Sequence, residues 1–142
     1  MQHVYRLMVG GLMIAGLHMT ACQESRSAYQ AEHPAEIEKI EGSDLSRVTL
    51  TERAVERLDL RTDKVGEEEG QKVVPYSSLI YDPQGQTWVY TSPEPRTFVR
   101  HKVDIDHIEG DRAVLKDGPP VGTVVASVAV AELYGAEFKV GH

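Results

Sequence analysis

The chain has 142 residues, a formal net charge of −7 and one cysteine. The acidic balance argues against nucleic-acid binding, because no basic stripe is available to neutralise phosphates. A single cysteine excludes an internal disulfide framework and a zinc-finger site, and a chain of this length without internal repeats is typical of one folded domain.

Residues 1–21 have the pattern of an export signal. Arg6 gives a basic start, the apolar run over residues 7–17 is too short to span a membrane comfortably, and small residues precede Cys22. Residues 19–22 resemble a bacterial lipobox, in which the cysteine is lipidated and becomes the mature N-terminus. We therefore predict a lipoprotein signal peptide over 1–21 and lipidation of Cys22. The alternative is an ordinary secretory signal with a chance cysteine.

The predicted location is the periplasmic side of the cell envelope, with the chain held in a membrane by its lipid anchor. Gln23 follows the cysteine where Asp would retain a lipoprotein at the inner membrane. By this resemblance, the outer membrane is favoured over the inner one.

Residues 22–46 are rich in Ser, Gln, Ala and Glu and nearly free of aromatic side chains. Such a segment buries too little apolar surface to offset the entropy lost on ordering. We predict a flexible tether that lets a folded module stand off the membrane.

The folded module is predicted over residues 47–142 and opens with an arm at 47–65. Thr51 is a plausible N-cap for a short helix at 53–58, in which Ala54, Val55 and Leu58 fall on one side. Residues 60–65 alternate as a weak strand. An acidic stretch at 66–71, bounded by glycines, is expected to be a solvated loop.

The second arm, residues 72–138, is predicted to be a series of short strands separated by turns containing Gly, Pro, Asp and Glu. The expected strands, which share β-branched and aromatic residues, cover 73–75, 78–81, 87–91, 97–105, 112–116 and 123–127. Their spacing predicts a mainly β fold, a small antiparallel β-barrel or β-roll with one or two short helices.

This order of segments resembles a known family. The sequence runs from VVPYSSLI through DPQGQ to TWVYTS and FVRHKVDI, and ends with GDRAVL, GPPVG and ELYGAE. It is similar to the membrane-proximal domain of periplasmic adaptor subunits, the membrane fusion proteins of RND-type and heavy-metal efflux systems. Residues 47–65 are similar to the segment that opens such adaptors.

The resemblance implies a truncated adaptor. In full-length adaptors, a β-barrel domain, a lipoyl-like domain and a helical hairpin separate the two arms, whereas here residues 66–71 take their place. The implied partners are an inner-membrane efflux transporter, its full-length adaptor, or both, and the membrane itself through the lipid anchor.

Metal binding and catalysis have weak support in the sequence. His101 and His107 are the only candidates for metal ligands, and strand periodicity puts them on one face with Val103 and Ile105, too far apart to share an ion unless the strand bulges. Arg100, Lys102, Asp104 and Asp106 would take the other face. No pattern of a nucleophile with its base is present, so we expect neither an enzyme nor a cofactor.

Aromatic residues suggest both core and contact positions. Trp88, Tyr90 and Phe98 are expected to form cross-strand core contacts. Tyr81, followed by Asp82, is expected at an exposed rim where it could contact a partner.

The predicted function is a non-catalytic accessory lipoprotein of a tripartite efflux or transport system. The alternative from a different class is a stand-alone periplasmic binding protein for a metal ion or small molecule. A remnant of an adaptor with only a structural role is a third possibility.

Overall fold

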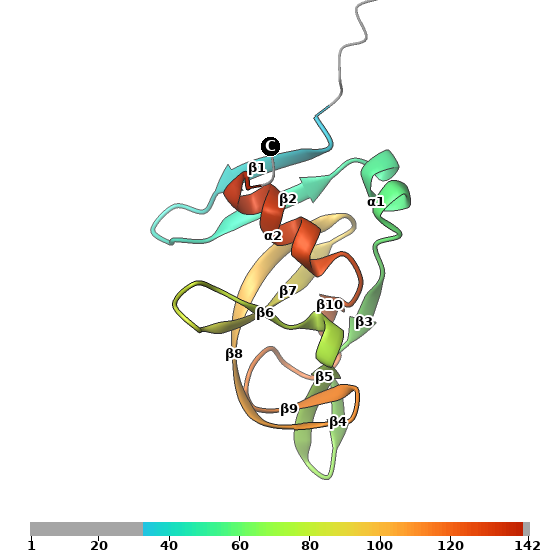
Figure 1. Ribbon diagram of the computed structural model, residues 1–142, viewed down its shortest axis with the longest axis vertical. Helices are drawn as coiled ribbons and strands as arrows, with labels where there is room; N and C mark the ends of the chain where they lie inside the picture. Colours follow the sequence, from blue (N-terminus) through green and yellow to red (C-terminus); the bar gives the residue numbers. More distant parts are fainter. Residues whose placement is uncertain (1–32, 141–142) are drawn as a thin grey trace, which may run out of the picture. The chain divides into compact units, whose positions relative to one another are not determined.

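A computed structural model describes residues 33–140, and within them the fold is mainly β. Ten strands of this part form one antiparallel sheet whose main path runs β3–β10–β7–β8–β9–β5–β4 (Figure 1). The two ends of the path, β3 (Thr62–Lys64) and β4 (Gly66–Glu68), are separated in the chain only by Val65. The sheet is therefore nearly closed, and the predicted small antiparallel barrel with one or two short helices is confirmed.

The second arm forms the strands of the barrel wall. They are β5 (Gln71–Pro75), β6 (Ile80–Tyr81), β7 (Thr87–Glu94), β8 (Thr97–Glu109), β9 (Arg112–Asp117) and β10 (Val124–Ala126). Each predicted strand has a counterpart here, although the one expected at 78–81 is preceded by a 3₁₀ turn, η1 (Tyr76–Ser78). Gly85 and Gly110 occupy turns at positive φ, as the turn signals indicated.

The middle of β7 is buried on both faces, because the sheet there separates two apolar cores. Tyr90 and Phe98 belong to the core beneath the helices, whereas Val89 and Val103 belong to the core inside the barrel. Consecutive residues of β7 therefore point into different cores, and both are fully buried. The alternation of buried and exposed residues expected of a half-buried strand is lost for this reason.

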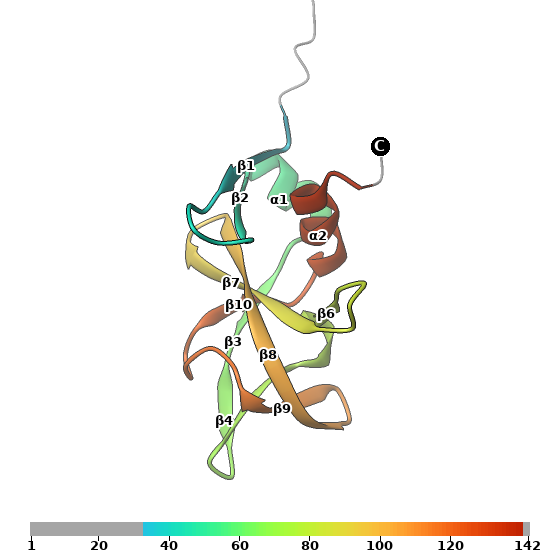
Figure 2. The same cartoon turned by 90° about the vertical axis from the view of Figure 1, so that its left-hand side faces the viewer.

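Two helices cover the first core. α1 (Glu52–Leu58) begins at Thr51, whose Oγ1 accepts a hydrogen bond from the Ala54 N–H at 3.1 Å, so the predicted N-cap is confirmed. α2 (Val130–Phe138) packs against β2 (Ser46–Leu50) and also contacts β1 (Ala35–Lys39), β6 and β7 (Figures 1 and 2). Neither helix is long and apolar enough to cross a membrane.

The prediction of a tether over residues 22–46 is wrong for its second half. Residues 35–39 form β1 (Ala35–Lys39), which pairs with β2 along its whole length. Ala35 and Ile37 pack against the first core, while Glu36 and Glu38 are exposed. The charged composition hid a strand with a clear period of two. The first part of the predicted tether, together with the signal peptide and Cys22, lies outside the described residues.

The acidic stretch at 66–71 is not a loop. β4 and β5 pair in register as a hairpin, with Glu68 opposite Gln71 and only Glu69 and Gly70 between them. Both turn residues have positive φ, +50° and +79°, the pattern of a type I′ turn, whose twist matches that of the strands. Arg112 also forms an ion pair with Glu68 across the sheet, so the carboxylates of this hairpin are partly neutralised.

Candidate functional site

The two candidate metal ligands, His101 and His107, are both exposed on β8. His101 lies opposite Val89 on β7. His107 lies opposite Val114 on β9, after two register shifts in the pairing of β8 with β9. The His107 ring nitrogen Nδ1 lies 2.8 Å from Asp106 Oδ2, so one of its ligand positions already faces a carboxylate. The structure does not bring the two histidines together into one cluster of ligands. Within residues 33–140, no group of three or more His, Cys, Asp or Glu side chains is placed to hold a metal ion.

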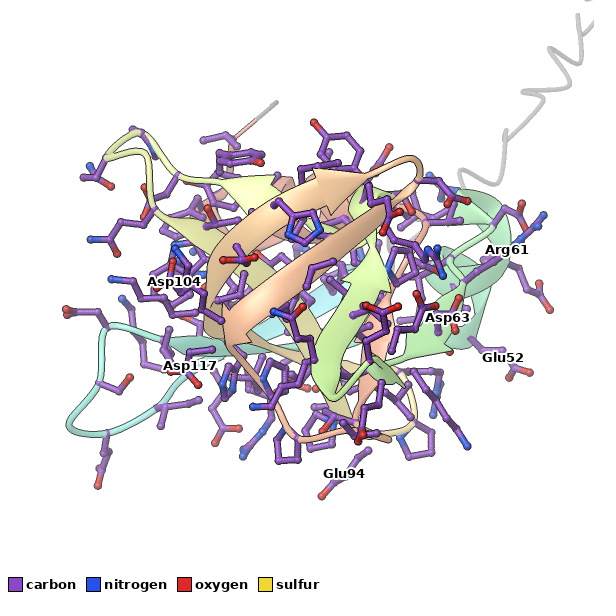
Figure 3. The ribbon with its side chains drawn as sticks, turned by 90° about the horizontal axis from the view of Figure 1, so that it is seen from below. Glu52, Arg61, Asp63, Glu94, Asp104 and Asp117 are labelled. Atoms are coloured by element: carbon purple, nitrogen blue, oxygen red, sulfur yellow. The ribbon has the colours of Figure 1, made fainter. Side chains whose placement is uncertain are left out.

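The carboxylates near these histidines are also separated. Asp104 lies directly opposite Asp117 in the register of β8 and β9, and the two lie on the same side of the ribbon in Figure 3. Asp106 instead contacts His107 and, at 3.8 Å, the Lys116 ammonium. The hydrogen bond from His107 is the main cause that lowers the pKa of Asp106 below its ordinary value. Register shifts in the pairing of β8 with β9 lie between Asp104 and His107, so the regular alternation of the strand is interrupted at these carboxylates.

The predicted contact residues, Tyr81 and Asp82, begin the turn between β6 and β7. Tyr81 is 51% exposed. The Asp82 carboxylate is occupied within the turn: Oδ1 accepts from the backbone N–H groups of Gln84 and Gln86, at 2.9 and 2.8 Å, and Oδ2 accepts from Trp88 Nε1 at 2.9 Å. Asp82 therefore fixes the turn that holds Tyr81 at the surface.

A buried polar cluster was not foreseen from the sequence. Arg100 on β8 was expected to share a polar face with Lys102, Asp104 and Asp106. Its side chain is only 7% exposed, and its Nε donates to Glu137 Oε2 on α2 at 2.8 Å. The Tyr90 hydroxyl donates to the same carboxylate oxygen at 2.7 Å. Glu137 Oε1 is buried and has no hydrogen-bond partner among the described residues.

Aromatic rings enclose the Arg100 guanidinium. Its central carbon lies 4.5 Å from the centre of the Trp88 ring and 4.8 Å from that of Phe138, both within the range of cation–π attraction. Burial, and then the hydrogen bond to Glu137, raise the pKa of the Tyr90 hydroxyl, which stays protonated and acts as a donor. The cluster fixes α2 to the face of β7 and β8.

The sequence did contain a signal for this cluster. Glu137 lies seven residues after Val130 and four after Leu133, so it falls on the buried stripe of α2. A glutamate at such a position needs a buried partner, and an arginine within an apolar strand is a natural one. The pairing itself joins residues 37 positions apart and cannot be read from local spacing.

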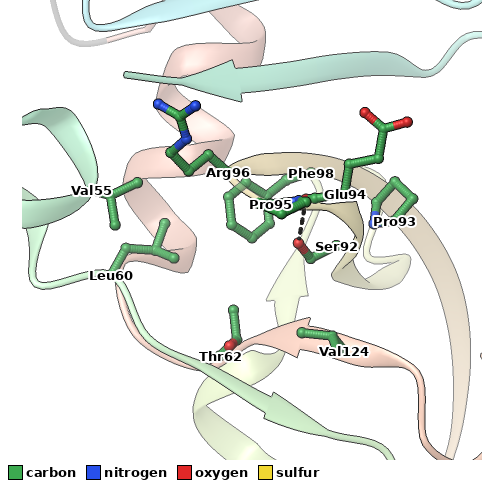
Figure 4. Close-up of a pocket in the computed structure, with 10 residues that line it drawn as sticks. All are labelled: Val55, Leu60, Thr62, Ser92, Pro93, Glu94, Pro95, Arg96, Phe98 and Val124. Atoms are coloured by element: carbon green, nitrogen blue, oxygen red, sulfur yellow. Dashed lines mark hydrogen bonds between the residues drawn. The ribbon is translucent and has the colours of Figure 1, made fainter. Parts of the chain in front are cut away.

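An open groove lies between α1, the β3–β10 pair and the turn that joins β7 to β8 (Figure 4). Its volume is about 420 Å³. Apolar side chains form much of its wall: Val55, Leu60, Phe98, Val124, Pro93 and Pro95. Ser92 Oγ donates to the carbonyl of Glu94 at 2.9 Å and so stiffens the turn on one side. The groove has the size and character of a site for an apolar group.

Comparison with known proteins found no relative of this chain. No family model, curated protein or solved structure matches the chain.

Proposed function

We propose that this chain is a non-catalytic accessory lipoprotein of a tripartite efflux or transport system. It is anchored by Cys22 at the periplasmic side of the envelope, and its module docks against an inner-membrane transporter, against that transporter's full-length adaptor, or against both. The proposal rests on the resemblance of residues 47–65 and 72–138 to a membrane-proximal domain.

The observation that carries the proposal is the direct joining of the two arms. Gly70 and Glu69 form a two-residue turn at the point where a full-length adaptor, by the resemblance, carries its long insertion. β3 of the first arm pairs with β10 of the second, so the arms build one sheet without that insertion. A module of this kind retains the adaptor's membrane-proximal part and lacks the domains that line its tunnel.

The test is affinity purification of the tagged full chain from native membranes solubilised in mild detergent, followed by mass spectrometry. The proposal predicts recovery of an inner-membrane transporter together with its full-length adaptor. Recovery of the bait alone, from membranes in which a transporter of this type is detected, would contradict it.

A matched variant sharpens this test. Tyr81→Ala removes the exposed ring of the predicted contact, and Tyr76→Ala removes a ring of similar exposure, 48% against 51%, at the start of η1. Loss of the transporter with the first variant and its retention with the second would place the contact at the β6–β7 turn.

The groove supports the second candidate function, a periplasmic binding protein for a small apolar molecule. Val124→Glu would place a carboxylate in the groove wall and should abolish binding of such a ligand. A thermal-shift screen of apolar compounds against the full chain and this variant distinguishes the two functions. A ligand that stabilises only the unaltered chain would favour the binding protein. The metal form of this alternative would require His101 and His107, and His101→Ala with His107→Ala tests it by metal titration.

A further inference from the structure

β1 has a partner on one side only. It pairs with β2 and with no other strand of residues 33–140. In Figures 1 and 2 it lies at one end of the folded part, with the β4–β5 hairpin at the other. A strand in this position presents unpaired N–H and C=O groups along its free edge, which is a template for another strand.

The register shows which backbone groups point outward. Just beyond the two ends of β1, the Thr51 N–H donates to the Pro34 carbonyl and the Ile40 N–H donates to the Leu45 carbonyl, each at 3.1 Å. Residues bonded across an antiparallel pair recur at every second position. Positions 36 and 38 therefore face β2. Ala35, Ile37 and Lys39 direct their N–H and C=O groups away from it.

The side chains beside this edge are mainly acidic. Residues 33–45 contain four carboxylates (Glu36, Glu38, Glu41 and Asp44) and one ammonium group (Lys39). Arg47 pairs with Glu38 at 3.0 Å, but the Glu38 side chain is still 67% exposed. Arg96, just before β8, lines the same hollow as Ala35 and Glu36, so Arg47 and Arg96 offset part of this negative charge and the carboxylates remain in excess.

We propose that the free edge of β1 binds an extended segment of another protein, in which basic and apolar residues alternate. Its backbone would pair with Ala35, Ile37 and Lys39. Its basic side chains would lie beside Glu36 and Glu38 on the exposed face, and its apolar side chains would continue the inner row of Ala35 and Ile37. This surface is independent of the proposed efflux function.

The register argues against a second copy of the chain as the occupant. If β1 paired with its own copy antiparallel and centred on Ile37, Glu36 would lie opposite Glu38 of the copy, and the reverse pair would repeat the contact. Like charges directly opposite each other destabilise a strand pair. A basic segment relieves this repulsion, whereas a second β1 adds to it.

The probe is a synthetic extended peptide in which Lys and Val alternate, and its counterpart has Glu in place of Lys. Calorimetry with the full-length chain should show binding of the basic peptide, weakened by added salt, and at least about tenfold weaker binding of the acidic one. Amide exchange at Ala35, Ile37 and Lys39 should slow when the basic peptide binds.

The decisive variant is Lys39→Pro. It removes an outward N–H that β2 does not use, and proline is tolerated at such edge positions. We expect about tenfold weaker peptide binding from the lost hydrogen bond and the blocked edge. Lys39→Ala is its matched control: it removes the same ammonium group but keeps the N–H, so affinity for a basic peptide should stay the same or rise.

A second pair of variants tests the charge. Glu36→Lys should weaken binding of the basic peptide about tenfold, whereas Asp44→Lys, the same charge change in the turn after β1, should have a much smaller effect. Both positions are exposed, so equal unfolding midpoints would show that the fold is kept.

Three results would overturn the proposal. They are no binding of the basic peptide at millimolar concentration, equal binding by the acidic peptide, and binding that Lys39→Pro leaves unchanged. A dimer of the unaltered chain that Lys39→Pro dissociates would show that a second copy is the occupant after all.

Discussion

Arg100 Nε lies 2.8 Å from Glu137 Oε2, and this contact joins the N-terminal part of β8 to the last turn of α2. The Glu137 side chain is 1% exposed and that of Arg100 is 7% exposed, so each charge depends on the other for neutralisation. Trp88 and Phe138 exclude water from the guanidinium, and Tyr90 adds a third hydrogen-bonding group.

Removing one partner of this pair should destabilise the fold strongly. Arg100→Ala leaves the Glu137 carboxylate buried without a counter-charge, and we expect a loss of about 3–5 kcal/mol in the free energy of unfolding. Urea denaturation followed by the fluorescence of Trp88, the chain's single tryptophan, measures it.

Two variants serve as controls for that loss. Arg61→Ala breaks an ion pair with Asp59 whose side chains are 66% and 70% exposed, and the midpoint should hardly move. Arg100→Met combined with Glu137→Leu should recover much of the lost stability, because no unpaired charge is left. A double variant as unstable as Arg100→Ala would contradict this account of the cluster.

The stability of the hairpin that joins the two arms should depend on Gly70. Its φ is +79° and nothing lies within 4 Å of an added Cβ, so the cost of Gly70→Ala comes from the backbone alone, about 1–2 kcal/mol. Gly70→Asn should lose less stability, since Asn tolerates the left-handed region. Thermal unfolding of both variants checks the order, and equal losses would argue against a type I′ turn.

The stability that Asp82 gives to the β6–β7 turn should decrease at acidic pH. Partial desolvation raises the pKa of this carboxyl, but the hydrogen bonds from Trp88, Gln86 and Gln84 and the nearby Arg100 outweigh it, so the pKa lies below the ordinary 3.8. The bonded carboxylate therefore contributes stability that is complete well above pH 3.8 and is lost as the pH falls through the lowered pKa. Asp82→Asn should lower stability near neutral pH and reduce its decline on acidification, read from Trp88 fluorescence. Parallel pH curves for the two proteins would contradict this.

Lipidation of Cys22 makes a separate prediction about location. Cys22→Ser should move the protein from the membrane fraction to the soluble periplasmic fraction, because the lipid chains that hold it would be absent. Cell fractionation and immunoblotting measure the change, with Ser25→Ala as a neighbouring control. An unchanged membrane fraction would remove the claim of a lipid anchor.

The barrel wall could be predicted because its signals are local. Residues 97–105 and 112–116 combine β-branched residues with glycine-containing turns, and β8 and β9 follow them closely. The helix after Thr51 was equally local, since one capping hydroxyl marks its start. Neither feature depends on contacts between distant parts of the chain.

The features missed by the sequence analysis depend on tertiary contacts. β1 looked like a charged tether because only its alternate residues, Ala35 and Ile37, meet the core. Side chains three residues apart on a strand point to opposite faces, so only one of Arg100 and Val103 would be buried in a strand with one core. Both are buried because β8 passes between two cores. The partner of Arg100 comes from a helix 37 residues away.

Site-specific photo-crosslinking in intact cells tests the central claim most directly. A benzoyl-phenylalanine at position 81 should crosslink to an inner-membrane efflux transporter or to its full-length adaptor. The same residue at position 76, similarly exposed in the unaltered chain, is the control for non-specific capture. A crosslink to either protein from position 81 and none from position 76 is the predicted result. No crosslink to either protein from position 81 or position 76, in cells that contain both, would contradict the docking function.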